Sequence, residues 1–292
     1  MTDISITLMD KYLHIILDYF LKVLVSTGTQ LLILFGPLLI LAFIMNYIAQ
    51  LNEEFSYKVF GRTIYLYVFG WLGTSVHELG HALFALIFGH HINEIVLFSP
   101  NAEAGSLGHV NHSFNKKSIY QNIGIFFIGI GPILLGALAL FLVTYALYQY
   151  SVTEISFPLG IESFKSLLAL KQIGFTVYKS GYSYISIVLF GAKTTWWKIV
   201  LLCYFLFSIG SSITLSPADI KSAFKGFLYF IVVLLLFNLA TLWIGNFMLT
   251  IVAKVSFYFS IFYFLMILSI IVNISFLFGL LLVSSIKSIF IK

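Results

Sequence analysis

Charged residues are scarce in this chain: Asp, Glu, Lys and Arg make up 9% of its 292 residues, whereas hydrophobic residues make up 60%. Soluble globular domains carry roughly 25% charged residues. This scarcity excludes an ordinary soluble domain and indicates an all-α, polytopic membrane protein. Only one cysteine, Cys203, is present. It excludes an internal disulfide bond and leaves the redox compartment open.

Arginine is almost missing as well, because Arg62 is the single one in the chain. The lysines are scattered between apolar runs rather than gathered in one basic stretch. Such residues are typical of the flanks of membrane spans, where they meet anionic lipid headgroups. The formal net charge of +5 is therefore attributed to contact with the lipid bilayer, and no nucleic-acid partner is expected.

Long apolar runs are abundant, and they predict about six transmembrane helices. Each run is at least as long as the roughly 20 residues that a helix needs to cross a bilayer. The runs cover residues 24–51, 63–89, 121–149, 196–216, 226–252 and 256–286. An even number of spans would bring both termini to one side, but the basic residues divide equally between the two sides and do not choose one.

The N-terminal segment, residues 1–22, has a pattern of its own. Asp10, His14, Asp18 and Lys22 recur every four positions between apolar residues. This spacing predicts an amphipathic helix at the membrane interface, although an ordinary solvated helix face fits equally well. Residues 23–292 are expected to form a single membrane domain.

Two connections are unusually long. Residues 92–113 contain two short alternating stretches around a cluster of turn-forming residues, which predicts a membrane-associated β-hairpin after the second span. Residues 151–195 are mixed in character and suggest interfacial helices.

The second span contains the stretch SVHELGHAL, with His77, Glu78 and His81 close to its middle. An ionisable residue at the centre of a bilayer costs at least about 2.5–3.5 kcal/mol, so such residues mark functional sites. Because residues i and i+4 of a helix share a face, the two imidazoles can converge on one zinc ion. Glu78 is then placed to take a proton from a metal-activated water. The pattern is typical of metalloproteases, although a pair of core histidines remains the alternative.

Zinc needs a third protein ligand and one open position. Asp219 is the best candidate, because it follows a polar interruption, residues 211–218, at the end of the fourth predicted span. Irregular backbone near a membrane is tolerated where it is buried or lines a polar cavity. Capping of the next helix by Ser216 or Asp219 is the simpler interpretation, and the two roles are compatible. The hydroxyls of Ser211, Ser212, Thr214 and Ser216 offer one route for water.

The remaining ionisable residues are weaker candidates. Most are expected to be solvated: Glu94 and Glu103 on the hairpin, His90 and His91 at the end of the second span, His109 and His112 on the second strand, and His14 on the N-terminal helix. Glycines in the second and third spans, such as Gly80 and Gly131, would allow close helix packing.

These features together resemble the site-2 proteases, a family of intramembrane zinc metalloproteases. The resemblance is carried by His77-Glu78-Leu79-Gly80-His81-Ala82 inside a span, the hairpin that follows, the Gly131-Pro132 element of the next span, and the distant Asp219. It covers about residues 63–225, the expected catalytic core. Two positions depart from the family: Leu135 stands where an asparagine is expected, and Asp219 is followed by Ile220 rather than glycine.

The resemblance implies a zinc-dependent endopeptidase that cleaves transmembrane segments of other proteins. His77, His81 and Asp219 would bind Zn²⁺, Glu78 would be the catalytic base, and the hairpin would receive the substrate as an added β-strand. Because the family hairpin is cytoplasmic, both termini would lie in the cytoplasm of a multi-pass protein of the cell membrane. Asn122, Asn238 or a backbone amide could replace the missing asparagine.

Two other functions remain open from the sequence. A membrane zinc protease of the prenyl-protein-processing type would take a later glutamate as its third ligand, and Glu154 and Glu162 are the only glutamates that follow the hairpin segment. A non-catalytic membrane protein could keep both the fold and the metal.

Overall fold

The computed structural model describes residues 2–101, 107–148, 167–191, 194–245 and 247–290. These residues are almost entirely helical. The helices are α1 (Thr2–Phe60), α2 (Arg62–Tyr65), α3 (Trp71–Ile87), α4 (Ile119–Tyr148), α5 (Leu167–Phe190), α6 (Trp196–Ser208), α7 (Pro217–Thr241) and α8 (Phe247–Phe290). A π-helical turn, Leu66–Gly70, joins α2 to α3, and a 3₁₀ turn, Gly210–Ser212, follows α6.

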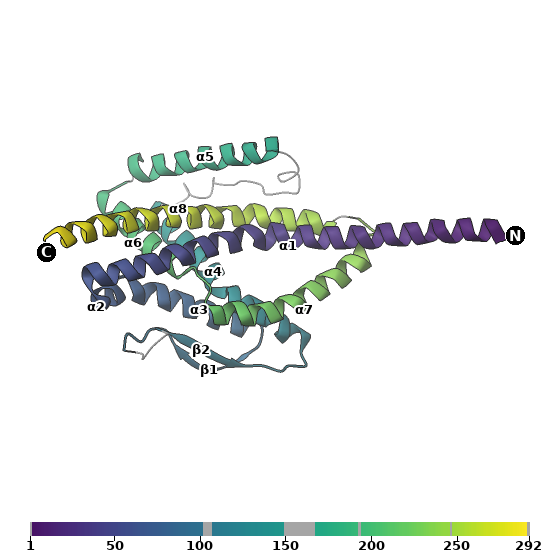
Figure 1. Cartoon of the computed structure of the whole chain (residues 1–292), viewed down its shortest axis with the longest axis horizontal. Helices are drawn as coiled ribbons and strands as arrows, with labels where there is room; N and C mark the ends of the chain where they lie inside the picture. Colours follow the sequence, from purple (N-terminus) through teal and green to yellow (C-terminus); the bar gives the residue numbers. More distant parts are fainter. Residues whose placement is uncertain (1, 102–106, 149–166, 192–193, 246, 291–292) are drawn as a thin grey trace.

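The expected hairpin follows α3. Strands β1 (His91–Val96) and β2 (His109–Ser113) pair antiparallel, with an irregularity in register between Ile92 and Glu94. The hairpin lies on the opposite side of the helical body from α5 (Figure 1).

Helix α1 runs without a break through the segment expected to be a separate interfacial helix. Residues 1–22 were assigned to that helix, and the described ones form the first part of α1. Apolar residues continue on both sides of position 22, and Pro37 sits inside the helix without ending it. The position of this segment relative to a membrane stays a prediction.

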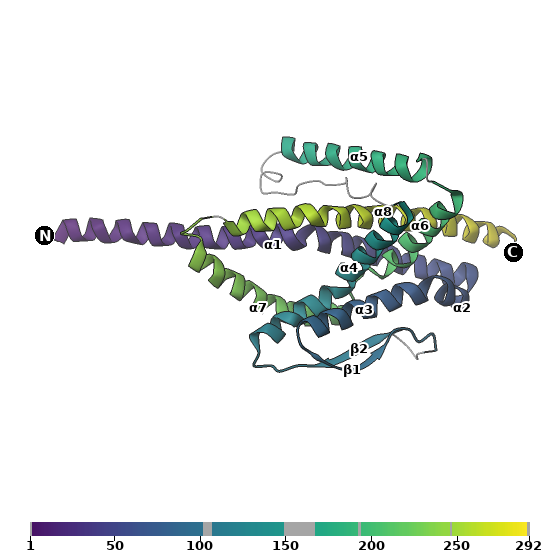
Figure 2. The ribbon, with the colours of Figure 1, turned by 180° about the vertical axis from the view of Figure 1, so that it is seen from behind.

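Helices α1 and α8 lie side by side and run in the same direction (Figures 1 and 2). The Tyr263 hydroxyl donates to the Leu34 carbonyl, Asn52 donates to Asn273, and Lys287 donates to the Val59 carbonyl, so residue numbers rise together along both helices. The two termini therefore lie at opposite ends of the long axis of the molecule. Six alternating spans would make the first and last antiparallel, whereas these two helices are parallel; the side of the membrane on which each terminus lies stays a prediction.

The reason lies in α6 and α7, which run in the same direction on either side of the break between Ser208 and Pro217. Tyr204 bonds to Val68 and Ser212 to His77, so α6 and its 3₁₀ turn run parallel to the residues leading into α3. Helix α7 continues in that sense, antiparallel to α1: Phe227 lies beside Phe35, whereas Leu239 lies beside Tyr19. The expected spans 196–216 and 226–252 are thus not two opposed crossings. A run of apolar residues shows how long a helix can be, but not the direction in which that helix runs through the molecule.

The boundaries of the later helices also differ from the expected ones. Helix α7 ends at Thr241, and α8 begins at Phe247 instead of residue 256. Leu242, Trp243 and Ile244 are apolar, so hydropathy gives no sign of this turn; Gly245 permits it with a φ of 157°. In the described residues, four helices are long and apolar enough to cross a membrane, namely Met9–Phe60, Ile119–Tyr148, Pro217–Thr241 and Phe247–Lys287. The segments 62–87 and 196–212 are helical but interrupted.

The helix that carries the two histidines crosses α4 at very short distance. A Cβ atom on Gly80 would lie 2.7 Å from the backbone of Gly131 and Pro132. Glycine at position 80 is therefore required for this approach, as the glycine-rich spans predicted. The contact fixes α3 against α4, which forms the centre of the largest apolar core with Ile133 and Leu140.

We expect Gly80→Ala to lower the stability of the protein in detergent by about 1–3 kcal/mol, the usual cost of overpacking. The added methyl group meets backbone, which must shift. Thermal unfolding measures the effect. Gly279→Ala on α8, where a Cβ would meet nothing within 4 Å, is the matched control and should leave the melting temperature unchanged or higher. Equal melting temperatures for the two variants would contradict the assigned contact.

Candidate metal centre

His77 and His81 lie one turn apart on α3, and their side chains converge. Their Nε2 atoms are 3.2 Å apart. The Nδ1 atom of His77 lies 2.9 Å from the carbonyl oxygen of Ser212, and that of His81 lies 2.8 Å from the carbonyl oxygen of Ile128. Two neighbouring elements, the 3₁₀ turn after α6 and helix α4, thus orient the two rings.

These contacts fix the tautomer of each neutral imidazole. A carbonyl oxygen only accepts a hydrogen bond, so each Nδ1 must carry the proton and donate it. Each Nε2 then keeps a lone pair, and the two lone pairs of His77 and His81 point at the same small space. Two bare nitrogens 3.2 Å apart repel each other unless a cation or a proton lies near both. The pair is thus prepared to bind a metal ion.

Asp219 brings a carboxylate to the same space from α7. Its Oδ1 is 3.3 Å from Nε2 of His81, and its Oδ2 is 3.8 Å from Nε2 of His77. The carboxylate is held by a capping box. The Ser216 amide donates to Asp219 Oδ2 over 3.0 Å, and the Asp219 amide donates to Ser216 Oγ over 3.1 Å. Pro217 occupies the first helical position. A backbone N–H at this position has no partner within the helix, so proline, which lacks one, begins the helix without losing a hydrogen bond. Asp219 is therefore both a helix cap and a member of the cluster.

The three side chains fit the requirements of a zinc ion. One ligand atom from each of His77, His81 and Asp219 lies within 4.8 Å of the others. Nitrogen ligands about 2.0–2.1 Å from a tetrahedral zinc lie about 3.3 Å apart, close to the observed 3.2 Å between the imidazoles. Two imidazoles and one carboxylate leave the fourth position of such an ion open.

Glu78 is buried beside this cluster, with 7% of its surface exposed. No hydrogen bond to its carboxylate arises from the described residues. A Cβ atom on Gly108 would lie 2.7 Å from the Cγ atom of Glu78, so the glycine lets the start of the hairpin's second strand approach the glutamate. Glu78 is placed between α3 and the hairpin rather than among the metal-binding atoms.

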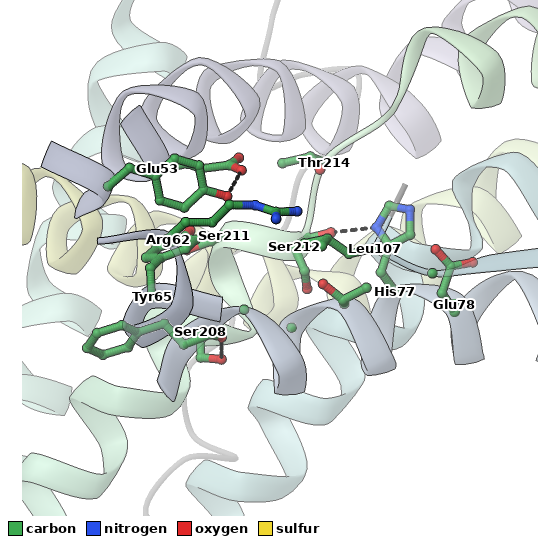
Figure 3. A pocket seen from close by; sticks show the side chains of 16 residues that line it. Glu53, Arg62, Tyr65, His77, Glu78, Leu107, Ser208, Ser211, Ser212 and Thr214 are labelled. Carbon is green, nitrogen blue, oxygen red and sulfur yellow. Dashed lines mark hydrogen bonds between the residues drawn. The ribbon is translucent and has the colours of Figure 1, made fainter. Parts of the chain in front are cut away.

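Two cavities meet at His77, Glu78 and Gly108. One, of about 660 Å³, is lined by His81, Asp219 and residues of β2. The other, of about 470 Å³, extends from the same glutamate towards Glu53 and Arg62 at the end of α1 and the start of α2 (Figure 3). Ser211, Ser212 and Thr214 line this second cavity, whereas Ser216 lines the larger one. The four residues suggested as a water route thus all border space that reaches Glu78.

The hairpin histidines are less solvated than expected. His90 is only 4% exposed and stacks on Phe114, with Nε2 2.9 Å from the Gln121 carbonyl. Its Nδ1 lies 3.0 Å from Nδ1 of His112, and His112 lines the larger cavity. Burial lowers the pKa of both imidazoles.

Other candidates lie elsewhere. Glu94 accepts hydrogen bonds from His109 and Asn111, which lower the pKa of its carboxyl, on the exposed hairpin surface. His109 also lines the larger cavity, whereas His14 and His91 are exposed, as expected. Glu103, Glu154 and Glu162 fall outside the described residues.

Neither of the two asparagines suggested as substitutes for the missing one bonds to a residue of the cluster. Asn122 donates to the Lys116 and Ser118 carbonyls at the start of α4. Asn238 bonds to Gln30 and Thr27 between α7 and α1. Neither lines the two cavities described here. The orienting carbonyls of Ser212 and Ile128 were also missed, because a backbone group has no signature in a sequence.

The chain is similar to one family of known proteins. The family model described as Peptidase M50B-like matches residues 40–220, which include all four residues of the predicted site. No curated protein and no solved structure gives a significant match.

Replacing Asp219 with alanine should weaken zinc binding by about 100-fold or more, since even changes to the groups behind a ligand cost 10–100-fold. Competition with a chelator, on the purified full chain, measures the affinity. Asp18→Ala, which removes an exposed carboxylate on α1, is the control. Unchanged affinity after Asp219→Ala would remove Asp219 from the ligand set.

The hairpin should lose stability as the pH falls. The folded pKa values of His90 and His112 lie below the ordinary value, about 6.5, so unfolding takes up protons in acid. The contribution of the two histidines to the stability of the hairpin is complete above about pH 6.5, and it is lost as the pH drops towards their pKa values in the folded state. Hydrogen exchange, corrected for intrinsic rates, should show weaker protection of the hairpin at pH 5 than at pH 7.5. His112→Asn should shrink this difference, whereas His14→Asn should not; an equal difference in both would contradict the assignment.

Proposed function

The chain belongs to the M50B-like peptidases of the site-2 protease family, and on this premise we propose that it is a zinc-dependent endopeptidase that cleaves transmembrane segments of other membrane proteins. The observation that carries the proposal is the convergence of His77, His81 and Asp219, with both imidazoles oriented by backbone carbonyls, among helices apolar enough to cross a membrane.

In this proposal, different residues of the chain bind the ion, orient its ligands and transfer the proton. His77, His81 and Asp219 hold the ion, and Ser212, Ile128 and Ser216 hold those three side chains in place. When bound, zinc supplies a Lewis acid that makes water nucleophilic near neutral pH and polarises a carbonyl group. Glu78 accepts the proton of the attacking water and passes it to the nitrogen of the leaving amine. Its burial beside the cluster supports this role, because little bulk water competes for the carboxylate.

The position of the hairpin supports a role for β2 in holding the substrate as an extended strand. Strand β2 supplies His109, Val110 and His112 to the cavity that contains the metal-binding atoms. Within the described residues β2 pairs only with β1, so its other edge can take up an additional strand. A transmembrane helix must unwind before cleavage, because its carbonyls are shielded, and pairing with an edge strand would hold it extended.

The expected setting is a multi-pass protein of the cell membrane that meets its substrate within the bilayer. The four long apolar helices and the peptidase family support the membrane setting. The parallel course of α1 and α8 does not support a cytoplasmic location of both termini, because parallel helices that cross a membrane begin on one side and end on the other.

Asp219 also bears on the two alternative functions. A prenyl-protein-processing type of site would need a later glutamate, whereas Asp219 already completes the set of three. A non-catalytic metal-binding protein would keep the same cluster, so only a measurement of cleavage separates it from the proposed peptidase.

We expect the full chain in detergent to cut single-span substrates within the span, and Glu78→Gln to lower the rate by about 10²–10⁴-fold, the usual contribution of a general base. Product mass spectrometry locates the cut, and zinc content should be unchanged in the variant. Glu94→Gln, on the exposed hairpin surface, is the control and should keep most of the activity. Zinc retention with no cleavage by the wild type of any substrate would favour the non-catalytic function instead.

A further inference from the structure

One end of the cavity of about 470 Å³ is lined by charged and polar residues that have no role in zinc binding or water activation. At one end lie His77 and Glu78; at the other lie Glu53, Tyr57 and Arg62. The larger cavity opens from the other side of His77 and Glu78. A peptide that passes the glutamate therefore has room on both sides of the bond to be cut, and one side ends at the only arginine of the chain.

Figure 3 shows the guanidinium of Arg62 turned into this cavity, on the side of Ser212 and His77. No acidic side chain of the described residues lies within ion-pair distance of it. The carboxylate of Glu53 instead accepts the hydroxyl proton of Tyr57. That hydroxyl is also the neighbour of Arg62. Since a guanidinium has five N–H donors, one phenol leaves most of them available for a ligand.

Lys58, at the same end of α1, is a basic residue whose charge is paired on the surface of the protein. Its Nζ pairs with Glu54 at 2.6 Å and lies 4.7 Å from the centre of the Phe55 ring, and it does not line the cavity. Arg62 differs in both respects, because it lacks a carboxylate partner among the described residues and shares a cavity with Glu78. Contact with lipid headgroups alone does not explain this orientation.

We propose that Arg62 is a specificity-determining residue: it binds a carboxylate of the peptide substrate in the cavity beside Glu78. A planar guanidinium matches a carboxylate through two parallel hydrogen bonds. The carboxylate comes either from an Asp or Glu side chain or from a free C-terminus of the substrate. This inference rests on the proposed peptidase function, since it assumes that a peptide occupies the cavity.

Helix geometry gives the spacing between the carboxylate and the bond that is cut. Arg62 precedes Glu78 by 16 positions, which is about 24 Å along a helix. The Arg62 side chain extends towards His77 and Glu78 and shortens this span by roughly 6 Å. An extended peptide covers about 3.3 Å per residue. The acidic group is therefore expected about five residues from the scissile bond.

Binding to the Glu78→Gln chain tests this without requiring turnover. Fluorescent single-span peptides carry Asp or Asn at successive positions, and the dissociation constant is measured for each in detergent. We expect the Asp peptide to bind about tenfold more tightly than the Asn peptide at one position about five residues from the cut. Adding Arg62→Gln should abolish the preference and Arg62→Glu should invert it towards Lys peptides, whereas Lys58→Gln should preserve it. A preference for free over amidated C-termini would identify the terminal carboxylate as the source.

Equal binding of Asp and Asn peptides, together with equal binding of free and amidated ends, would overturn the proposal, as would a preference that survives Arg62→Gln. Thermal unfolding shows whether the Arg62 variants remain folded. The proposed function fails separately: a wild-type chain that shows the Arg62-dependent preference but cuts no peptide is not a protease, whereas one that cuts peptides without the preference retains the function and refutes the subsite.

Discussion

The interruption between α6 and α7 is the constraint on which the rest of the structure depends. Within eight residues it supplies the Ser212 carbonyl that orients His77 and the Asp219 carboxylate that completes the cluster. An unbroken helix would have used that carbonyl internally and turned the aspartate elsewhere. Irregular backbone inside an apolar body needs partners for its polar groups, and here His77 of α3 is one of those partners. The side chains of the candidate metal site and the interruption therefore stabilise each other.

The surrounding helices keep this break in position. Gly80 allows α3 to lie directly on the Gly131-Pro132 backbone of α4, which brings the Ile128 carbonyl within reach of His81. Behind the break, the side chains of Asn273 and Ser269 on α8 bond to the Leu206 carbonyl of α6, and Asn273 also accepts the hydroxyl of Ser211. Such buried polar contacts are costly to break in a medium without water. They hold the interruption against the parallel pair α1 and α8.

The sequence was most informative where chemistry is local. The spacing of His77 and His81 predicts one helical face, and Ser216-Pro217-Ala218-Asp219 predicts a capped helix start; both follow from neighbours along the chain. The hairpin was found from alternation and turn residues. What could not be predicted depends on contacts distant in sequence: the direction of α7, the carbonyls that orient the imidazoles, and the cover over His90. Arg62 was interpreted only as the boundary of a span, because nothing in its neighbours shows that it turns inward.

The capping box around Asp219 has a consequence for the order in which this protein matures. Ser216 fixes the carboxylate through two hydrogen bonds within the chain, and backbone carbonyls fix both imidazoles. The donor atoms are thus arranged by the polypeptide itself, unlike those of small zinc domains, in which the ion organises the fold. We expect the chain to insert and fold first and to acquire its ion afterwards, so that metal supply would control how many molecules are active without changing how many survive quality control.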